Sequence, residues 1–308
     1  MRFTKMHGTG NDYIYINGFE ETIDNPAELS RQISDRHFGV GSDGLIIIAP
    51  SDKANFRMRM WNSDGSEGKM CGNGIRCVAK YVYEKGLTDK TFLTIETGAG
   101  IKRLWLEASG GRMSSVQVDM GEPNFIPDEI PTTLSKRQLK HHRIRTEHGI
   151  HHITTLSMGN PHCVLFVKDC SKLDLEGIGS ALGAHPIYPD RTNVEFVELI
   201  SRKTLKMRVY ERGAGETLAC GTGACACLVA AVLNDQSERE ADIILRGGTL
   251  HIEWCEADNH VYMRGPAEFV CEGIWPFPTD TLRPETAPEA PVNADPRLSS
   301  ENKETLHA

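Results

Sequence analysis

The chain has no long apolar run and no excess of positive charge. Its 308 residues include 34 Lys and Arg against 42 Asp and Glu, a formal net charge of −8. No stretch approaches the roughly 20 apolar residues of a membrane span, and the charges in residues 1–7 do not suit a secretion signal. The charge balance gives no global attraction for nucleic acid. We therefore expect a soluble, cytoplasmic protein that binds a small molecule and neither nucleic acid nor a membrane.

Motifs for metals and nucleotides are also missing. Nine cysteines, an odd number without zinc-site spacing, are typical of free thiols in a reducing compartment. Cys77, Cys225 and Cys227 are expected to line buried helix faces. Residues 39–44 spell the dinucleotide fingerprint, but a helix precedes them and a strand follows, the reverse of the required order. We expect no metal and no cofactor. The one basic stretch, residues 136–145, has no interleaved aromatic residues and is expected to form a solvated helix face or loop.

A duplication is the most informative feature that is present. Cys71-Gly72-Asn73-Gly74 and Cys220-Gly221-Thr222-Gly223 lie 149 residues apart. The same offset aligns residues 10–14 with 159–163, 56–62 with 205–211, and Glu67 with Glu216. Four registrations at one offset indicate two related halves with one such cysteine in each.

Each cysteine precedes an apolar run that is competent to form a helix, 75–84 and 224–234. A thiol at a helix N-terminus has a lowered pKa, and the free N–H groups there can bind an anion. A buried structural cysteine does not need the glycines that follow, because glycine is unfavourable in a first helical turn. Two halves packed face to face would put a thiol on each side of one molecule. One thiolate could then remove a proton while the opposite thiol returns one, which inverts a carbon centre.

Polar residues at related positions complete the candidate site. Asn11 aligns with Asn160, and Asn62 aligns with Glu211, which precedes Arg212. Together with Asn193 these side chains suit an amino acid that carries a second ammonium and carboxylate. His162 follows Asn160 by two residues and is expected to help set the charge of a thiol. His148, His151 and His152 are interpreted as surface or strand histidines.

The predicted fold class is α+β, with two pseudo-symmetric domains that each wrap strands around a central helix. Strands are expected at 13–17, 45–49, 56–62, 92–97, 101–107 and 115–120, then at 153–157, 163–167, 194–199, 205–211, 243–246, 250–256 and 260–265. Further helices are expected at 26–38 and 175–185. The domains are predicted as 1–120 and 121–265, with a disordered tail at 281–308, where Pro, Glu, Ala, Asn and Ser dominate.

The motifs together closely resemble those of the diaminopimelate epimerase family over about residues 1–280. They are residues 5–12 (KMHGTGND), 62–67 (NSDGSE), 70–76 (MCGNGIR), 159–162 (GNPH), 191–196 (RTNVEF) and 211–223 (ERGAGETLACGTG). The resemblance implies a cofactor-independent epimerase that interconverts LL- and meso-diaminopimelate in lysine and cell-wall precursor biosynthesis. It implies a homodimer, an active site between the two domains, and a last strand, within about 266–280, that completes the first domain.

By the same likeness, Cys71 and Cys220 are the two proton donors and acceptors. Backbone N–H groups of Gly72, Asn73, Gly221 and Thr222 bind the reacting carboxylate. The rest of the substrate is held by Asn11, Asn62, Asn160, Asn193, Glu211 and Arg212. His162 and Glu211 also assist the thiols. One departure is Gly44, where some family members carry a glutamine that reaches the substrate.

Two alternatives remain open at this point. The first is another two-thiol racemase of the same fold, acting on proline, hydroxyproline or histidine. Those substrates lack the distal zwitterion that Glu211, Arg212, Asn62 and Asn193 suit. The second is a binding protein in which Cys71 and Cys220 form a regulatory disulfide.

Overall fold

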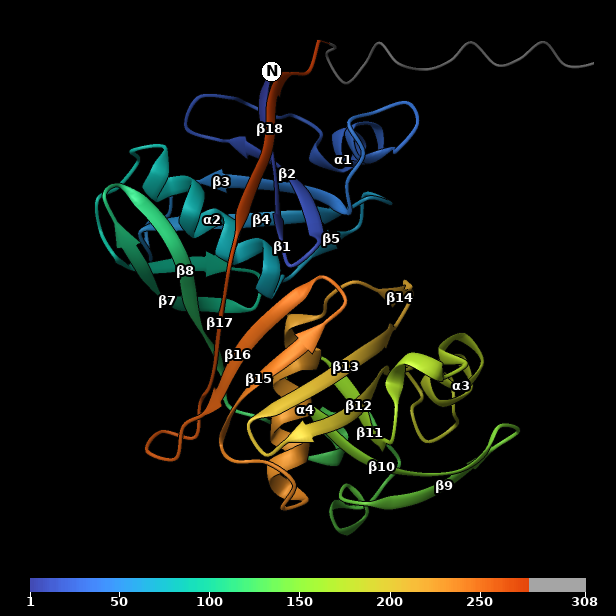
Figure 1. Cartoon of the computed structure of the whole chain (residues 1–308). Coiled ribbons are helices and arrows are strands. Elements are labelled where there is room, and N and C mark those ends of the chain that lie inside the picture. Colours follow the sequence, from blue (N-terminus) through green and yellow to red (C-terminus); the bar gives the residue numbers. More distant parts are fainter. Residues whose placement is uncertain (277–308) are drawn as a thin grey trace, which may run out of the picture. The chain divides into compact units, whose positions relative to one another are not determined.

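Two helices of thirteen residues, α2 (Gly72–Glu84) and α4 (Gly221–Leu233), are the centres of the fold. In the computed structural model, which describes residues 1–276, strands wrap around each of them (Figure 1). Two shorter helices, α1 (Pro26–Ser34) and α3 (Leu175–Gly183), lie outside these layers. The predicted α+β class, with a central helix in each half, is confirmed.

The strands of the first half enclose α2. They are β1 (Arg2–Gly8), β2 (Asn11–Asn17), β3 (Gly44–Ala49), β4 (Phe56–Asn62), β5 (Glu67–Gly68), β6 (Phe92–Thr97), β7 (Gly100–Ser109) and β8 (Arg112–Gly121). β2 and β3 pair in parallel, as do β4 and β6, and the remaining pairs are antiparallel. The long helix α2 packs on β1, β2 and β8.

The second half repeats the arrangement around α4. Its strands are β9 (His142–Thr146), β10 (Gly149–Ser157), β11 (Pro161–Val167), β12 (Asn193–Ser201), β13 (Thr204–Glu211), β14 (Gly215–Thr217), β15 (Glu240–Leu245) and β16 (Gly248–Trp254). The parallel pairs β11–β12 and β13–β15 match β2–β3 and β4–β6 of the first half. The duplication read from the sequence is therefore also a duplication of strand pairing.

The last two strands join the halves. β17 (Val261–Gly265) pairs with β16 on one side and with β8 on the other. The chain continues directly into β18 (Glu268–Ile274), which pairs antiparallel with β1. Met1–Trp275 consequently forms one unit. The division into 1–120 and 121–265 stays a prediction, and the predicted tail at 281–308 lies outside the described residues.

Helix α4 is buried on all sides and accordingly has almost no polar face. The residues from Ala224 to Ala231 are fully buried, as expected for a helix that is apolar all round. Cys77, Cys225 and Cys227 are all 0% exposed, which confirms their predicted place on buried helix faces. No helix within residues 1–276 is long and apolar enough to cross a membrane.

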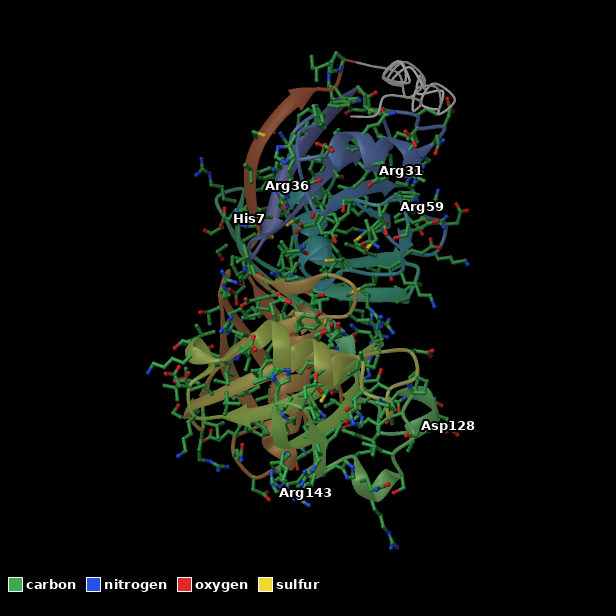
Figure 2. The ribbon with its side chains drawn as sticks, turned by 90° about the vertical axis from the view of Figure 1, so that its right-hand side faces the viewer. His7, Arg31, Arg36, Arg59, Asp128 and Arg143 are labelled. Atoms are coloured by element: carbon green, nitrogen blue, oxygen red, sulfur yellow. The ribbon has the colours of Figure 1, made fainter. Side chains whose placement is uncertain are left out.

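The prediction for the basic stretch at 136–145 was partly wrong. A short 3-10 helix, Lys136–Gln138, is followed by β9, which pairs antiparallel with β10. Within β9 the side chain of Ile144 is buried while Arg143 and Arg145 are exposed. Charges on the outward face therefore hid the two-residue period of a strand. Figure 2 shows Arg143 far from Arg36, so this basic segment is remote from the first half.

Candidate active site

Both predicted cysteines cap a central helix. Cys71 is the N-cap of α2 and Cys220 is the N-cap of α4, each with an extended backbone. The Gly74 N–H donates to the Cys71 sulfur over 3.3 Å, and the Gly223 N–H donates to the Cys220 sulfur over 3.4 Å. The predicted position at the helix N-terminus is confirmed, and this capping hydrogen bond is the same in the two halves.

The glycines after each cysteine are required by close packing within the protein. A Cβ atom on Gly72 would lie 3.0 Å from Met263 Cε, and one on Gly221 would lie 3.0 Å from Met263 Sδ. On Gly74 it would meet Ile46 at 2.6 Å, and on Gly223 it would meet Glu195 Oε1 at 2.9 Å. Packing within the protein thus accounts for these glycines, which the sequence argument took as evidence against a structural cysteine. Because one side chain, Met263, lies over the first residue of both helices, the two helix starts are neighbours.

A buried arginine also links the two helix starts. Arg76 is 0% exposed, and its Nη1 donates to the Gly72 carbonyl and to Asn73 Oδ1. The Asn73 amide in turn donates to the carbonyl of Ala219, next to Cys220, over 3.3 Å. The other acceptors of Arg76 are neutral as well: the Pro266 carbonyl, Thr9 Oγ1 and Met263 Sδ. Burial lowers the pKa of Arg76, and its guanidinium contacts the first two residues of α2.

Asn11 contacts the Cys71 thiol. The thiol donates to Asn11 Oδ1 over 3.3 Å, and Asn11 Nδ2 donates to Asp43 Oδ2 over 2.7 Å. Asp43 is held in turn by Arg36, which is labelled in Figure 2, over 2.9 Å. Since Asp43 takes the donor side of the amide, the acceptor side faces the thiol. Burial, and then the neighbouring Asp12, raises the pKa of Asp43.

His162 and Asn160 belong to a second group, in which His162 is fully buried and Asn160 is partly buried. His162 Nε2 lies 3.0 Å from Asn160 Oδ1, and its Nδ1 lies 2.6 Å from Glu195 Oε1. Both His162 and Glu195 are 0% exposed. Thr222 Oγ1 lies 3.4 Å from the Cys220 sulfur. The sequence argument singled out His162 and Asn160 but not Glu195.

The thiols are harder to ionise than their position at helix N-termini suggested. Burial raises the pKa of Cys71, although N–H groups from Gly74 and Asn73 lower it in part. Burial, followed by the charges of Glu211 and Glu195, raises the pKa of Cys220 well above its usual range. The predicted lowering was therefore wrong for the protein without substrate. Desolvation of a thiolate outweighs what the helix N-terminus contributes.

Glu211 acts on both thiols. Its charge raises the pKa of Cys71 and of Cys220 alike. The pKa of Glu211 is itself raised, mainly by burial, while a hydrogen bond from Thr217 lowers it. A single carboxylate that acts on both thiols places all three groups in one region of the molecule.

The remaining predicted residues are hydrogen-bonded to other parts of the chain. Asn193 Nδ2 donates to the Pro161 carbonyl, and Asn193 Oδ1 accepts from the Arg212 backbone N–H over 2.9 Å. The Arg212 guanidinium is exposed and donates to the Asp190 carbonyl. Asn62 is exposed and donates to Ser66. A cavity of about 280 Å³ lies beside α3, with Arg191, Thr192, Tyr210 and Arg212 among its lining residues.

Gly44 leaves no room for a side chain in this chain. A Cβ atom there would lie 2.1 Å from the Trp61 carbonyl oxygen and 2.9 Å from Tyr13. A residue with a side chain at this position therefore requires the backbone of β3 to move.

Four residues of the site escaped the sequence argument: Tyr13, Asp43, Arg76 and Glu195. Two of them interrupt an apolar pattern: Arg76 lies in an apolar helix, and Glu195 stands between Val194 and Phe196 in an apolar strand. Charged residues are rarely fully buried unless they are paired or functional. Tyr13 could also have been found, since it aligns with His162 at the 149-residue offset.

The fold defines a class of protein. A solved structure described as a probable proline racemase from Agrobacterium radiobacter K84 superposes with a TM-score of 0.67, over 91% of this chain and 94% of that chain. Its sequence is 14% identical, so the likeness concerns the fold alone. The chain thus has the two-half fold of that racemase.

Sequence comparison gives the family. The family model described as diaminopimelate epimerase matches residues 3–126 and 154–270. Two proteins named diaminopimelate epimerase, from Acetivibrio thermocellus and Methanococcus maripaludis, are 58% and 54% identical over 273 residues. Each match covers 89% of this chain and at least 98% of the relative. The chain belongs to the diaminopimelate epimerase family, as the motifs of the sequence indicated.

Proposed function

We propose that this protein is a cofactor-independent epimerase that interconverts LL- and meso-diaminopimelate by proton transfer between Cys71, the substrate α-carbon and Cys220. The observation that carries the proposal is the matched capping of α2 and α4 by these two thiols, beside one shared carboxylate, Glu211. The substrate is inferred from the names of the relatives. Lysine and cell-wall precursor biosynthesis in the cytoplasm, by a homodimer, belongs to the same proposal and is supported by family membership.

Inversion requires one thiol and one thiolate at the same time. The thiolate takes the α-proton from one face, and the thiol gives its proton to the other face, so that the two exchange roles in each turnover. His162 and Glu211 assist the change of charge on the thiols. Substrate binding expels water and brings an ammonium group near the thiols. A nearby cation stabilises the thiolate and so opposes the rise in pKa that burial causes.

The reacting carboxylate belongs at the two helix starts. The first N–H groups of a helix have no partner within the helix, and the residues concerned are Gly72, Asn73, Gly221 and Thr222. Negative charge grows on this carboxylate as the α-carbon loses its proton, and fixed N–H dipoles stabilise it without reorganisation. The buried charge of Arg76, whose acceptors are all neutral, favours an anion at the same place.

The distal end of the substrate carries a second ammonium and carboxylate. We assign its recognition to Asn11, Asn62, Asn160, Asn193, Glu211 and Arg212. Arg212 is the one cation of this set and is exposed, so it suits the distal carboxylate. Proline, hydroxyproline and histidine have no distal carboxylate and would leave this end without a partner.

Incubation of reduced protein with LL-diaminopimelate, followed by chiral analysis, tests the proposal. We expect the meso form to accumulate until the LL and meso isomers reach equilibrium, without any added cofactor. Proline, hydroxyproline and histidine serve as parallel substrates. Absence of meso product, or equal turnover of proline or histidine, would contradict the assignment of diaminopimelate as the substrate.

A further inference from the structure

The two halves differ in charge beside their cysteines. At the 149-residue offset Ile46 aligns with Glu195, and Tyr13 aligns with His162. Ile46 Cδ1 packs against Gly74 in the first turn of α2, whereas Glu195 Oε1 occupies the same place against Gly223 in the first turn of α4. The Cβ position of Gly223 that lies 2.9 Å from Glu195 Oε1 also lies 3.3 Å from the Cys220 sulfur. A carboxylate therefore stands beside Cys220 where a methyl group stands beside Cys71.

Glu195 is unusual among the buried groups of the site. It is 0% exposed, and only one of its oxygens is hydrogen-bonded within the described chain: Oε1 lies 2.6 Å from His162 Nδ1, and Oε2 has no partner. A buried carboxylate oxygen without a partner is costly. Replacing Glu195 by the isoleucine of the other half would avoid this cost, so the charge needs a functional reason.

Each thiol has hydrogen bonds that lower its pKa and charges that raise it, and these neighbours differ between the two halves. The Tyr13 hydroxyl hydrogen-bonds Cys71 and lowers its pKa, although burial raises it overall. At Cys220, burial is followed by the charges of Glu211 and Glu195, and all three raise the pKa. Glu211 raises the pKa of both thiols, so it does not distinguish them. Glu195 lies beside Cys220 and raises the pKa of that thiol.

We propose that Glu195 is a positioning residue that makes the two repeat-related thiols unequal before substrate binds, keeping the proton on Cys220 and leaving Cys71 to ionise first. This inference rests on the proposed two-thiol function. The titratable and charged groups that face Cys71 are Tyr13, Tyr15, Arg76, Cys77 and Glu211. Those that face Cys220 are Glu195, Glu211 and Cys227, with His162 behind Glu195.

A difference in the pH at which the two thiols ionise is useful for proton transfer. A thiol–thiolate pair is competent only while one member is ionised and the other is not. If both thiols ionised at the same pH, this state would be well populated only in a narrow pH range. If they ionise at different pH values, it is populated throughout the range between the two. Glu195 therefore widens the pH range over which the enzyme is ready to bind substrate and invert it.

Alkylation with iodoacetamide at a series of pH values, with peptide mass spectrometry to separate the two sites, tests the proposal in the absence of substrate. The quantity compared is the pH midpoint of each alkylation rate, because limited access changes the rate but leaves the midpoint in place. In the wild-type protein we expect Cys71 to have the lower midpoint. In Glu195→Gln the Cys220 midpoint should fall by at least one pH unit, a tenfold change in ionisation, while Cys71 moves little.

Two further variants make the test specific. Glu195→Asp retains the charge and should restore most of the difference between the two midpoints. Glu216→Gln is the matched control, since Glu216 is a half-buried carboxylate that pairs with Arg208 and Arg246, and it should leave both midpoints unchanged. In kinetics, the alkaline limb of kcat/KM should move to lower pH in Glu195→Gln, because that limb reports loss of the proton from Cys220.

The wild-type measurement alone can overturn the inference, even if a Glu195 variant fails to fold. A lower midpoint at Cys220 than at Cys71 would contradict it, as would an unchanged difference in a folded Glu195→Gln protein. Failure of the two-thiol function would look different. In that case Cys71→Ala or Cys220→Ala would retain activity, whatever the order in which the thiols ionise.

Discussion

Asn73 donates a hydrogen bond from its side-chain amide to the backbone carbonyl of Ala219 over 3.3 Å. The bond joins the first turn of α2 to the residue before Cys220, across a sequence separation of 146 residues. It fixes the start of one helix against the start of the other. The spacing of the two thiols therefore depends on a side chain as well as on the packing of the two halves.

Asn73→Ala tests this link. The change removes the donor to the Ala219 carbonyl and one acceptor of Arg76, at a cost of about 1–3 kcal/mol in stability. We also expect kcat to fall, because the helix starts are no longer held at a fixed distance. Urea denaturation and steady-state kinetics measure the two effects. The matched control is Asn234→Ala at the other end of α4, where the amide bonds Thr154, and it should cost stability while leaving kcat near its wild-type value.

Cys71→Ala and Cys220→Ala should each abolish epimerisation while the protein stays folded. A positioned acid or base contributes ~10²–10⁴ in rate, and loss of either one removes the only route to inversion in this account. Circular dichroism establishes the fold, and turnover of LL-diaminopimelate establishes activity. Cys255→Ala removes a half-buried thiol outside the site and should turn over normally. Wild-type turnover in either active-site variant would end the two-thiol account.

Arg212→Met should weaken substrate binding at least tenfold. A charge-assisted hydrogen bond to the distal carboxylate is worth ~1.5–3 kcal/mol, and the guanidinium of Arg212 is exposed. Isothermal titration with an unreactive diaminopimelate analogue measures the change. Arg246→Met, an exposed arginine that pairs with Glu216, should bind as the parent does. If the Arg212 variant binds the analogue as tightly as the parent does, Arg212 does not bind the distal carboxylate.

Stability should fall as the pH rises above 9, because buried thiols stay protonated in the folded state. Burial raises the pKa of Cys77 and of Cys225 from 9.0 to about 12. Between these values the unfolded chain loses the proton and the folded chain keeps it, so each thiol lowers the free energy of unfolding by about 1.4 kcal/mol per pH unit. Below pH 9 neither state ionises and the effect is absent.

Urea denaturation at pH 8 and pH 10 measures this loss. Cys77→Ala should reduce the difference between the two pH values by about 1.4 kcal/mol. Cys271→Ala, which removes an exposed thiol, should leave the difference as it is. A Cys77 variant with the same pH dependence as the wild type would mean that the buried thiol does not hold its proton in the folded state.

The repeat made much of this molecule predictable. The offset between Cys71 and Cys220 led to the paired helices, and the glycines at the same offset, Gly10 and Gly159, have φ angles of 88° and 93°, as a matched turn requires. Strands with alternating apolar residues were found within a few residues of their true ends. β1 was missed because Thr4 and Gly8 occupy its buried face, so its pattern does not look apolar.

The charges were the hardest part to predict. Sequence position suggested activated thiols, but the pKa of a thiol depends on how much water its fold excludes, and that follows from the packing of residues far apart in the chain. The partnership of Glu195 with His162 arises in the same way, from strands β11 and β12 lying side by side. The sequence separation of His162 and Glu195 does not predict their contact, because the contact follows from the pairing of the two strands.

Turnover in deuterated water tests the central claim most directly. If Cys71 and Cys220 act from opposite faces, the thiol that protonates the product has already exchanged with solvent, and the other thiol alone holds the substrate's proton. Starting from LL-diaminopimelate, we predict deuterium at the inverted α-carbon of meso product from its first appearance, while recovered LL substrate stays largely protiated. Early meso product that retains the original protium would show that a single base serves both faces, and would contradict the paired roles of Cys71 and Cys220.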